Sequence, residues 1–254
     1  MDYYKSLVLN NIPLYKIMSL KWFEVMVNER NNTLLRPSSW EDPYETNYSN
    51  SVIHTEHCDI PLDASHWFGQ CWSLCDESAI MWQAFKKEAE PYVKIMVEAQ
   101  NLTKLLVDEG KEIRIAILER IRYFKPTTKD YKEKLNDVMS LNAWPHNFLN
   151  RGLGLAELYP MYSLLTKRDV FKHEEEVRLL LFDKSSSGNQ KFVKYPFDPT
   201  TISEVVVDPW TSLNDEKFNK IKNNLSKYLP IDKTIIRKSE LYCDSNKFSI
   251  KYNL

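Results

Sequence analysis

Glycine is scarce in this chain, with five residues among 254, and none of the five forms a phosphate-binding loop. Loops of the P-loop, kinase or Rossmann type need closely spaced glycines so that the backbone can approach a phosphate. A Gly-x-Ser-x-Gly motif is also missing, and no histidine has an evident nucleophile partner. These absences argue against the commonest nucleotide-binding folds and against a serine hydrolase.

Long apolar runs are absent too. The longest, Leu179-Leu180-Leu181-Phe182, is far short of the roughly 20 residues that a membrane-spanning helix needs. The first residues lack the basic and apolar parts of a secretory signal. We therefore expect a cytoplasmic protein without a membrane partner. The four cysteines (Cys58, Cys71, Cys75 and Cys243) suit reduced thiols, and they form no familiar zinc-ligand spacing with the histidines, so no metal is expected.

The net charge of −1 conceals segregated charge. Residues 41–63 contain six acids and no base, whereas 111–134 contain eight bases and four acids, and 217–238 contain seven bases and one acid. Basic residues interleaved with aromatic rings suit a single nucleic-acid strand, because phosphates pair with the Lys and Arg side chains and nucleobases stack on the rings. The candidates in the first basic segment are Arg120, Arg122, Tyr123 and Lys125. The alternative is a solvated surface, which charge runs of this size often form.

Hydrophobic spacing predicts a mixed chain of strands and helices. Strands are expected at 12–17, 33–36, 67–74, 92–99, 113–123, 177–182, 192–195, 202–207 and 234–237. Helices are expected at 20–29, 76–88, 101–108, 130–141, 155–169 and 214–228, with a long loop at 40–65. This order predicts one α+β domain over residues 1–254, in which helices are inserted between strands of a mainly antiparallel sheet and a helical, basic insertion occupies about 100–160.

The sharpest local pattern is Glu174-x-Glu176-x-Arg178 at the entry to a predicted strand. Strand side chains alternate between faces, so these three residues should project together. An arginine keeps a neighbouring carboxylate ionised, while two adjacent carboxylates push one pKa upward, which can divide acid and base roles. The alternative is an exposed strand face with an ion pair.

Three other polar or aromatic residues stand near expected strand ends. Trp40 and Tyr44 are large amphipathic rings that either contact a ligand or close the edge of the core. Ser73 either binds a ligand or hydrogen-bonds the local backbone.

Several short motifs follow one another along the chain. They are Leu14-Tyr15-Lys16, Trp40-Glu41-Asp42-Pro43-Tyr44-Glu45, Cys71-Trp72-Ser73, Met81-Trp82, Phe171-x-x-Glu174-x-Glu176-x-Arg178, Val205-Val206-Val207-Asp208-Pro209 and Lys238-Ser239-Glu240-Leu241-Tyr242. In order, they resemble a widespread bacterial domain-of-unknown-function family, which typically has Leu-Tyr-Lys-Tyr-Arg, Asn-Asp-Pro-Phe-Glu, Cys-Phe-Ser with Met-Trp, and Glu-x-Glu-x-Arg. Here Ile17 and Met18 replace the family's early Tyr-Arg, and Glu41 replaces its Asn.

The motif order is in turn similar to that of ADP-ribosyltransferases, including toxins of bacterial toxin–antitoxin and phage-defence loci. This resemblance implies an ADP-ribosyltransferase-like split sheet and NAD as a substrate, with an antitoxin protein as partner, with or without a chaperone. It implies that Glu176 stabilises the oxocarbenium-like transition state, and that Glu174 deprotonates or orients the acceptor. We expect the acceptor to be a nucleic acid, RNA rather than DNA.

The same resemblance implies which residues bind NAD. Because the family's early arginine is missing, Lys16 or Arg36 would bind the pyrophosphate. Tyr44 or Trp40 would stack on nicotinamide, and Ser73 would orient Glu176 or the ribose. The remaining expected contacts are Tyr15 and Arg178.

Two alternative functions stay open at this point. One is a non-enzymatic module of a defence operon that binds nucleic acid or a partner. The other is metal-dependent cleavage of nucleic acid, with Asp42, Glu174 and Glu176 as oxygen ligands.

Overall fold

The computed structural model describes residues 11–40, 42–46, 52–54, 56–87, 89–103, 114–125, 129, 155–230 and 232–242. The expected helix at 130–141, and most of the expected insertion at 100–160, lie outside these described residues.

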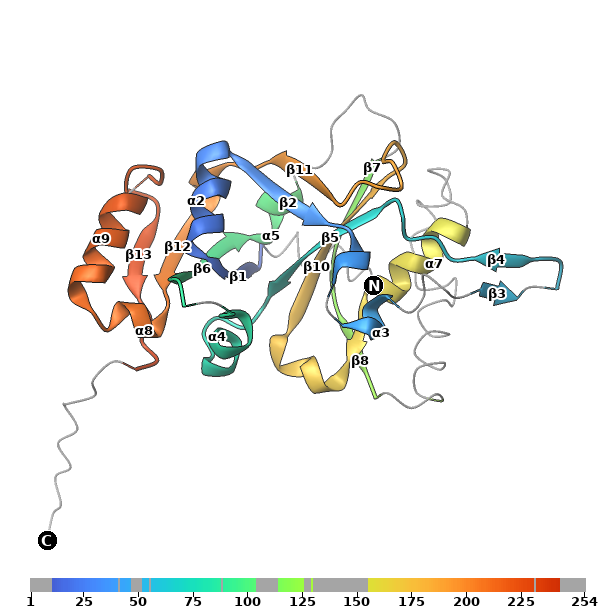
Figure 1. The fold of residues 1–254 in the computed structure, drawn as a ribbon, viewed down its shortest axis with the longest axis horizontal. Coiled ribbons are helices and arrows are strands. Elements are labelled where there is room, and N and C mark those ends of the chain that lie inside the picture. The colour runs from blue at the N-terminus through green and yellow to red at the C-terminus, as the bar shows by residue number, and fades with distance from the viewer. Residues whose placement is uncertain are drawn as a thin grey trace, which may run out of the picture.

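A nine-stranded sheet forms the centre of the described part of the chain (Figure 1). Its order is β11–β2–β5–β1–β6–β12–β13, with β10 paired to β5 and β7 paired to β10. All of these pairs are antiparallel except β12 with β13, which confirms a mainly antiparallel α+β fold. The strands are β1 (Pro13–Ser19), β2 (Asn31–Leu35), β5 (Trp67–Ser73), β6 (Tyr92–Glu98), β7 (Arg114–Arg120), β10 (Glu176–Asp183), β11 (Phe192–Pro196), β12 (Ile202–Val207) and β13 (Ile235–Lys238).

Two short strand pairs lie outside the main sheet. β3 (Val52–His54) and β4 (Asp59–Pro61) form an antiparallel hairpin, which projects to the right in Figure 1. β8 (Arg122–Phe124) and β9 (Thr166–Arg168) pair in parallel, so that Tyr123 and Lys167 are register partners.

The main sheet is weakly joined between β1 and β5. These strands share a single register pair, Tyr15 with Ser73, whereas β1 is paired with β6 over seven residues and β5 with β10 over seven. The sheet therefore opens where β1 and β5 separate.

Helices cover both faces of the sheet. On the first face, α2 (Leu20–Glu29), α5 (Ala99–Thr103) and α9 (Asp215–Leu225) pack over one large core that includes Leu14, Trp72 and Val177. On the second face, apolar residues form two smaller clusters. One joins α7 (Leu155–Leu164) to β5, β7 and β10, and the other joins Trp82 of α4 (Ala79–Phe85) to β6 and β12.

Local sequence explains several element ends. The Ser19 hydroxyl caps α2 by accepting a hydrogen bond from the Trp22 N–H, and the helix ends where Arg30 adopts a left-handed conformation with φ 53°. α8 (Pro209–Ser212) is capped by Asp208, and α9 by Asn214. β10 is buried along its whole length, since helices cover both faces of the sheet there.

Three expectations about local structure are wrong. The expected loop at 40–65 contains α3 (Pro43–Thr46) and the β3–β4 hairpin. The expected strand at 113–123 is divided at Ile121, because β7 pairs with β10, whereas β8 begins at Arg122 and pairs with β9 instead. The expected helix at 155–169 ends at Leu164, and β9 begins two residues later, since β8 supplies it with a strand partner.

The remaining described elements are short 3-10 helices, η1 (Pro37–Ser39), η5 (Asp169–Glu174) and η6 (Pro199–Thr201). None of the helices in the described ranges is long and apolar enough to cross a membrane.

Candidate active site

A cavity of about 100 Å³ lies on the second face of the sheet, above the gap between β1 and β5. Tyr15 of β1 and Ser73 of β5 line it where the two strands meet. Met81 and Phe85 of α4 supply apolar lining, and Glu174 and Glu176 supply carboxylates. The cavity thus combines apolar walls with a small set of polar groups, as ligand sites usually do.

Two side chains from the first face also reach this cavity through the gap. Lys16 donates from Nζ to the Cys71 carbonyl at 2.9 Å, and its ammonium lies 5.8 Å from the centre of the Trp72 ring. Both Lys16 and Trp72 line the cavity. Burial lowers the pKa of Lys16.

Glu176 is the first residue of β10, and only 2% of it is exposed. Its Oε1 accepts a hydrogen bond from Arg178 Nε at 2.6 Å, and its Oε2 accepts one from Lys167 Nζ at 2.9 Å. The Glu176 N–H donates to the Tyr123 hydroxyl at 2.8 Å. Both the carboxylate and the main chain of Glu176 are therefore fixed.

Glu174 reaches the same place by a different route from the one the sequence predicts. It ends η5 rather than belonging to the strand, and Glu175 then adopts a left-handed conformation with φ 43°. The Ser73 hydroxyl donates to the Glu174 carbonyl at 2.6 Å, which fixes this turn. The Glu174 Oε2 accepts a hydrogen bond from Lys167 at 2.7 Å, so Lys167 joins Glu174 to Glu176.

Arg178 is completely buried beside them. It donates to the Leu164 carbonyl at 2.6 Å, to Glu176 and to Glu45 of α3, and its guanidinium lies 4.4 Å from the centre of the Trp40 ring. Three carboxylates therefore surround two cations, which leaves one net negative charge. We refer to Glu45, Glu174, Glu176, Lys167 and Arg178 as the carboxylate cluster.

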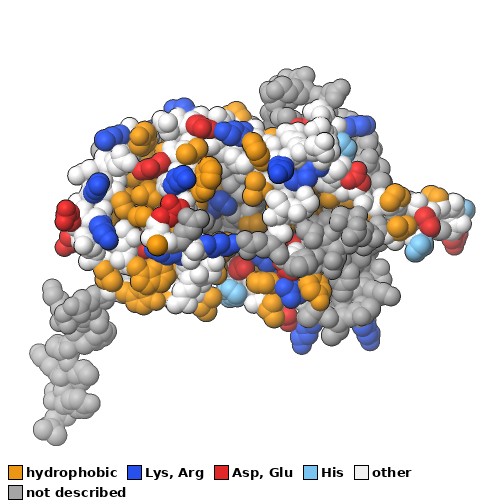
Figure 2. All heavy atoms as spheres, in the orientation of Figure 1, with side chains coloured by type: hydrophobic (Ala, Val, Ile, Leu, Met, Phe, Trp, Pro, Cys, Tyr) orange, Lys and Arg blue, Asp and Glu red, His pale blue; other side chains and the backbone are white. Residues whose placement is uncertain are grey.

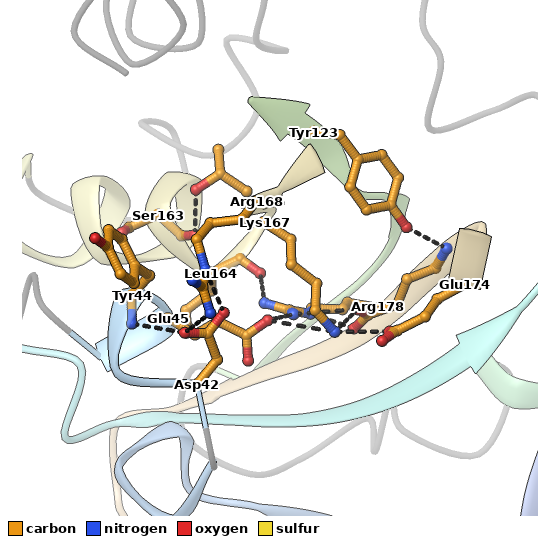
Figure 3. A network of polar contacts seen from close by, with 12 residues as sticks. Asp42, Tyr44, Glu45, Tyr123, Ser163, Leu164, Lys167, Arg168, Glu174 and Arg178 are labelled. Carbon is orange, nitrogen blue, oxygen red and sulfur yellow. Dashed lines mark hydrogen bonds and ion pairs between the residues drawn. The ribbon is translucent and has the colours of Figure 1, made fainter. Parts of the chain in front are cut away.

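Figure 3 shows how several elements converge on this cluster. Lys167 points toward Glu174, Arg178 points toward Glu45, and Tyr123 approaches from β8. A second ion pair lies alongside, in which the Arg168 NH2 group donates to Asp42 at 3.1 Å. The Arg168 guanidinium also lies 4.5 Å from the centre of the Tyr44 ring.

The two glutamates of the cluster have pKa values shifted in opposite directions. Burial alone would raise the pKa of Glu176, but Arg178 and Lys167 outweigh it and lower that pKa to about 2. Burial raises the pKa of Glu174, against the opposing effect of Lys167. Glu176 is thus held ionised, while Glu174 takes up a proton more readily than a free glutamate.

Three of the expected cofactor-binding residues line the cavity: Tyr15, Lys16 and Ser73. Burial raises the pKa of Tyr15, and Lys94 lies 4.7 Å from its ring centre. The Ser73 hydroxyl donates to the Glu174 carbonyl and accepts from the Cys75 N–H. Its hydrogen bonds thus position the Glu174 main chain rather than the Glu176 carboxylate.

Other expected cofactor contacts lie elsewhere. Arg36 donates to the carbonyls of Ser187 and Gln190, at 2.8 and 2.5 Å, in the turn between β10 and β11. Trp40 and Tyr44 stack on the guanidinium groups of Arg178 and Arg168 instead of lining the cavity. Arg178 itself is enclosed by Trp40, Glu45 and Glu176, so its role is to hold the cluster together.

The expected nucleic-acid contacts divide into two kinds. Arg120 ends β7, Arg122 begins β8 and Lys125 follows β8, and all three are exposed. Tyr123 differs, because its ring packs against the α7 cluster and its hydroxyl bonds the Glu176 N–H. Burial raises its pKa to about 12. Tyr123 therefore positions Glu176 and is not an open stacking surface.

The second basic segment does not border the cavity. Phe218, Ile221 and Leu225 of α9 belong to the first-face core, together with Val177. Glu176 and Arg178 alternate with Val177 along β10 and point to the other face. In Figure 2, basic and acidic side chains are mixed over the end of the molecule where α9 lies.

Among the described residues, no group of three or more His, Cys, Asp or Glu side chains could hold a metal ion. The three carboxylates expected for metal-dependent cleavage each bond a cationic side chain. Asp42 pairs with Arg168, and both Glu174 and Glu176 pair with Lys167.

The sequence analysis missed Lys167, although it contacts both glutamates. Its place in β9 depends on pairing with β8, more than forty positions earlier in the chain. It also missed the role of Glu45, which was noted only as part of a motif.

No protein-family model and no curated protein matches the chain. The domain-of-unknown-function resemblance therefore stays a prediction. Three solved structures of Thermus sp. 2.9 DarT are similar to this chain. The complex with ADP-ribosylated ssDNA has 11% sequence identity and a TM-score of 0.39, and the alignment covers 90% of this chain and 95% of that one.

For the DarT complex with NAD+, the values are 11% identity, a TM-score of 0.37, and coverage of 91% and 96%. The complex with carba-NAD+ has 10% identity and a TM-score of 0.35, and the alignment covers 90% of this chain and 94% of that one. Likeness at this level assigns no activity to the present chain.

Proposed function

We propose that this chain is an ADP-ribosyltransferase that cleaves the nicotinamide–ribose bond of NAD and transfers ADP-ribose to a nucleic acid. The observation that supports it most is the carboxylate cluster. Glu176, held ionised by two cations, lines a cavity at the gap between β1 and β5.

The net charge of the cluster suits this chemistry. When the bond from ribose C1′ to the nicotinamide nitrogen breaks, its electron pair goes to the nitrogen, and positive charge develops on the ribose. A carboxylate already fixed in place stabilises that charge without reorganising. Glu176 has this property because Arg178 and Lys167 hold its two oxygens.

The cavity size limits how NAD binds. About 100 Å³ is well below the roughly 300–1,000 Å³ of pockets that enclose drug-sized ligands, so the cavity encloses one end of the dinucleotide. In the proposed complex the nicotinamide riboside end lies beside Glu176, in contact with the rings of Tyr15 and Phe85. Lys16, rather than Arg36, binds the pyrophosphate, because Lys16 lines the cavity.

The exposed arginines at the end of β7 and the start of β8 support a polyanionic acceptor. Arg120 and Arg122 lie on either side of Ile121, whose N–H bonds the Glu176 carbonyl, so they stand near the catalytic end of β10. Phosphates of a bound strand would pair with these side chains. Nothing in the described residues distinguishes RNA from DNA. Since one similar structure contains ADP-ribosylated ssDNA, the assay includes both.

A role as a toxin, with a protein antitoxin that restrains it, is the cellular part of the proposal. Unrestrained modification of nucleic acid would stop the growth of the host cell, so such an enzyme needs a partner that limits it.

The test is incubation with NAD labelled in its adenosine part, in the presence of separate single-stranded DNA, RNA and protein pools. Wild type is expected to label one nucleic-acid pool, and Glu176→Gln to label it at least about 100-fold more slowly. Glu29→Gln, at an exposed glutamate paired with Lys194, is the matched control and should keep full activity. Labelled protein alone would overturn the nucleic-acid acceptor, and equal rates for wild type and Glu176→Gln would overturn the site.

A further inference from the structure

Lys167 contacts three carboxylates beside the cavity, and the proposed function so far uses only its contact with Glu176. Its ammonium lies 2.7 Å from Glu174 Oε2, 2.9 Å from Glu176 Oε2 and 3.7 Å from Glu45 Oε1. The Phe171 ring centre is 4.8 Å from it, and only 11% of its side chain is exposed. This place is fixed by the β8–β9 ladder, in which Lys167 is the partner of Tyr123.

The two glutamates that Lys167 bridges are held unequally. Glu176 bonds Lys167 and Arg178, and Tyr123 also holds its main chain. The hydrogen bond from Lys167 to the Glu174 carboxylate goes to Oε2, and among the described residues only Lys167 bonds that carboxylate. Glu174 is therefore the carboxylate with capacity to exchange a proton.

We propose that Lys167 is a positioning residue that holds Glu174 beside Glu176 and makes Glu174 the group that accepts the proton of the ADP-ribose acceptor. This inference rests on the proposed function. In the transfer step, an acceptor O–H or N–H group forms the new bond to ribose C1′ through its lone pair. Its proton goes to Glu174, nicotinamide leaves with the electron pair of the broken bond, and Lys167 stays protonated throughout.

The charges around Glu174 are consistent with its role as the proton acceptor. Burial raises its pKa, and Lys167 is the strongest opposing influence, so removing Lys167 should raise that pKa further. The other titratable or charged groups that face this part of the site come from β1, α3, β5, β8, η5 and β10. They are Lys16, Glu45, Cys71, Tyr123, His173, Glu176 and Arg178.

The test is the pH dependence of ADP-ribose transfer by wild type, Lys167→Gln, Lys167→Arg and the control Lys172→Met, at an exposed lysine of the same short helix η5 that contains Glu174. Transfer should fall at low pH as Glu174 becomes protonated. In Lys167→Gln the midpoint of this fall should move up by about one pH unit, because a cation within hydrogen-bond distance is lost. Lys167→Arg should keep the midpoint, and Lys172→Met should keep both midpoint and rate.

A second variant keeps the proposal testable if Lys167→Gln does not fold. Glu174→Gln should abolish the acidic fall and slow transfer at neutral pH by about 100-fold or more, as expected for loss of a general base. An acidic fall that persists in Glu174→Gln would overturn the inference.

The failures of the two proposals can be told apart. If wild type consumes no NAD at any pH, the proposed function fails. If wild type transfers ADP-ribose but Lys167→Gln loses rate with an unchanged midpoint, Lys167 is only structural, and this inference alone fails.

Discussion

Strand β5 is buried on both faces, but its two faces differ in chemistry. On the cavity side, Cys71 and Ser73 lie beside the carboxylate cluster. On the other side, Gln70 and the Trp72 indole N–H join a neutral network with Asn32 and Tyr195, in which every contact is a hydrogen bond between uncharged groups. Charge is thus concentrated in the cluster beside the cavity, while the network around Gln70 on the core side is polar without charge, which is the less costly way to bury polar atoms.

We call the cavity side of β5, which carries the carboxylate cluster, the charged side, and the side with the Gln70 network the neutral side. The largest effect is expected from removing the central cation of the charged side. Arg178→Met would remove the fully buried cation that Glu45 and Glu176 share and leave Lys167 to balance three carboxylates, and breaking a buried pair in this way typically costs about 3–5 kcal/mol. Arg30→Met is the matched control, because its pair with Asp198 is exposed, at 65% and 41%, and such pairs contribute about 1 kcal/mol or less. Urea unfolding measures both variants. Equal losses would contradict the view that the carboxylate cluster is structurally central.

The charged side should also make stability depend on pH. The pKa of Glu176 is about 2 in the folded chain and near 4.5 when unfolded, so the stabilisation that it gives is complete above about pH 5. This stabilisation, about 3 kcal/mol, is lost as the pH falls toward 2. Unfolding free energies measured at pH 7, 4 and 2.5 should therefore fall more steeply for wild type than for Glu176→Gln. Identical slopes would count against an ionised Glu176.

Close packing on the charged side predicts a somewhat smaller effect at Gly69. A Cβ there would lie 2.7 Å from Trp40 Cζ2 and 2.9 Å from Leu180 Cδ2, so Gly69→Ala must displace the ring that stacks on Arg178. We expect a loss of about 1–3 kcal/mol in thermal or urea unfolding. Gly188→Ala, where a Cβ would meet nothing within 4 Å, should change stability far less. A harmless Gly69→Ala would mean that Trp40 is not closely packed.

The neutral side should respond least, and without pH dependence. Tyr195→Phe removes a hydroxyl that accepts from Asn32 Nδ2 at 2.9 Å, which leaves one of the two amide hydrogens of Asn32 without an acceptor, since the other bonds Gln70, and costs about 1–2 kcal/mol. Tyr228→Phe, at an exposed tyrosine, is the control. The loss in Tyr195→Phe should be the same at pH 7 and pH 4. A loss that varied with pH would remove the contrast between the two sides of β5.

The sequence predicted the parts of this arrangement that depend on local pattern. Residue alternation correctly placed Glu176 and Arg178 on one face, because β10 begins at Glu176 and continues without a bulge. The helix at 20–29 and the strand at 202–207 also have the expected bounds, since their hydrophobic periods agree with their tertiary environment.

The rest depends on contacts between distant parts of the chain. Lys167 was missed because the apolar spacing of 155–169 suits a helix, and only pairing with β8 turns its end into a strand. Either Lys16 or Arg36 was expected at the pyrophosphate, and no local pattern indicates that Arg36 donates to two carbonyls of the turn at 187–190. No local pattern indicates that Glu175 adopts a left-handed conformation, although this turn brings Glu174 to Lys167.

The most direct test of the central claim is the rate of nicotinamide release from NAD by wild type and Glu176→Gln, with circular dichroism confirming that both are folded. The account predicts steady release by wild type and a rate at least about 100-fold lower for Glu176→Gln. Release at equal rates, or no release by folded wild type with single-stranded DNA and RNA both supplied, would contradict it.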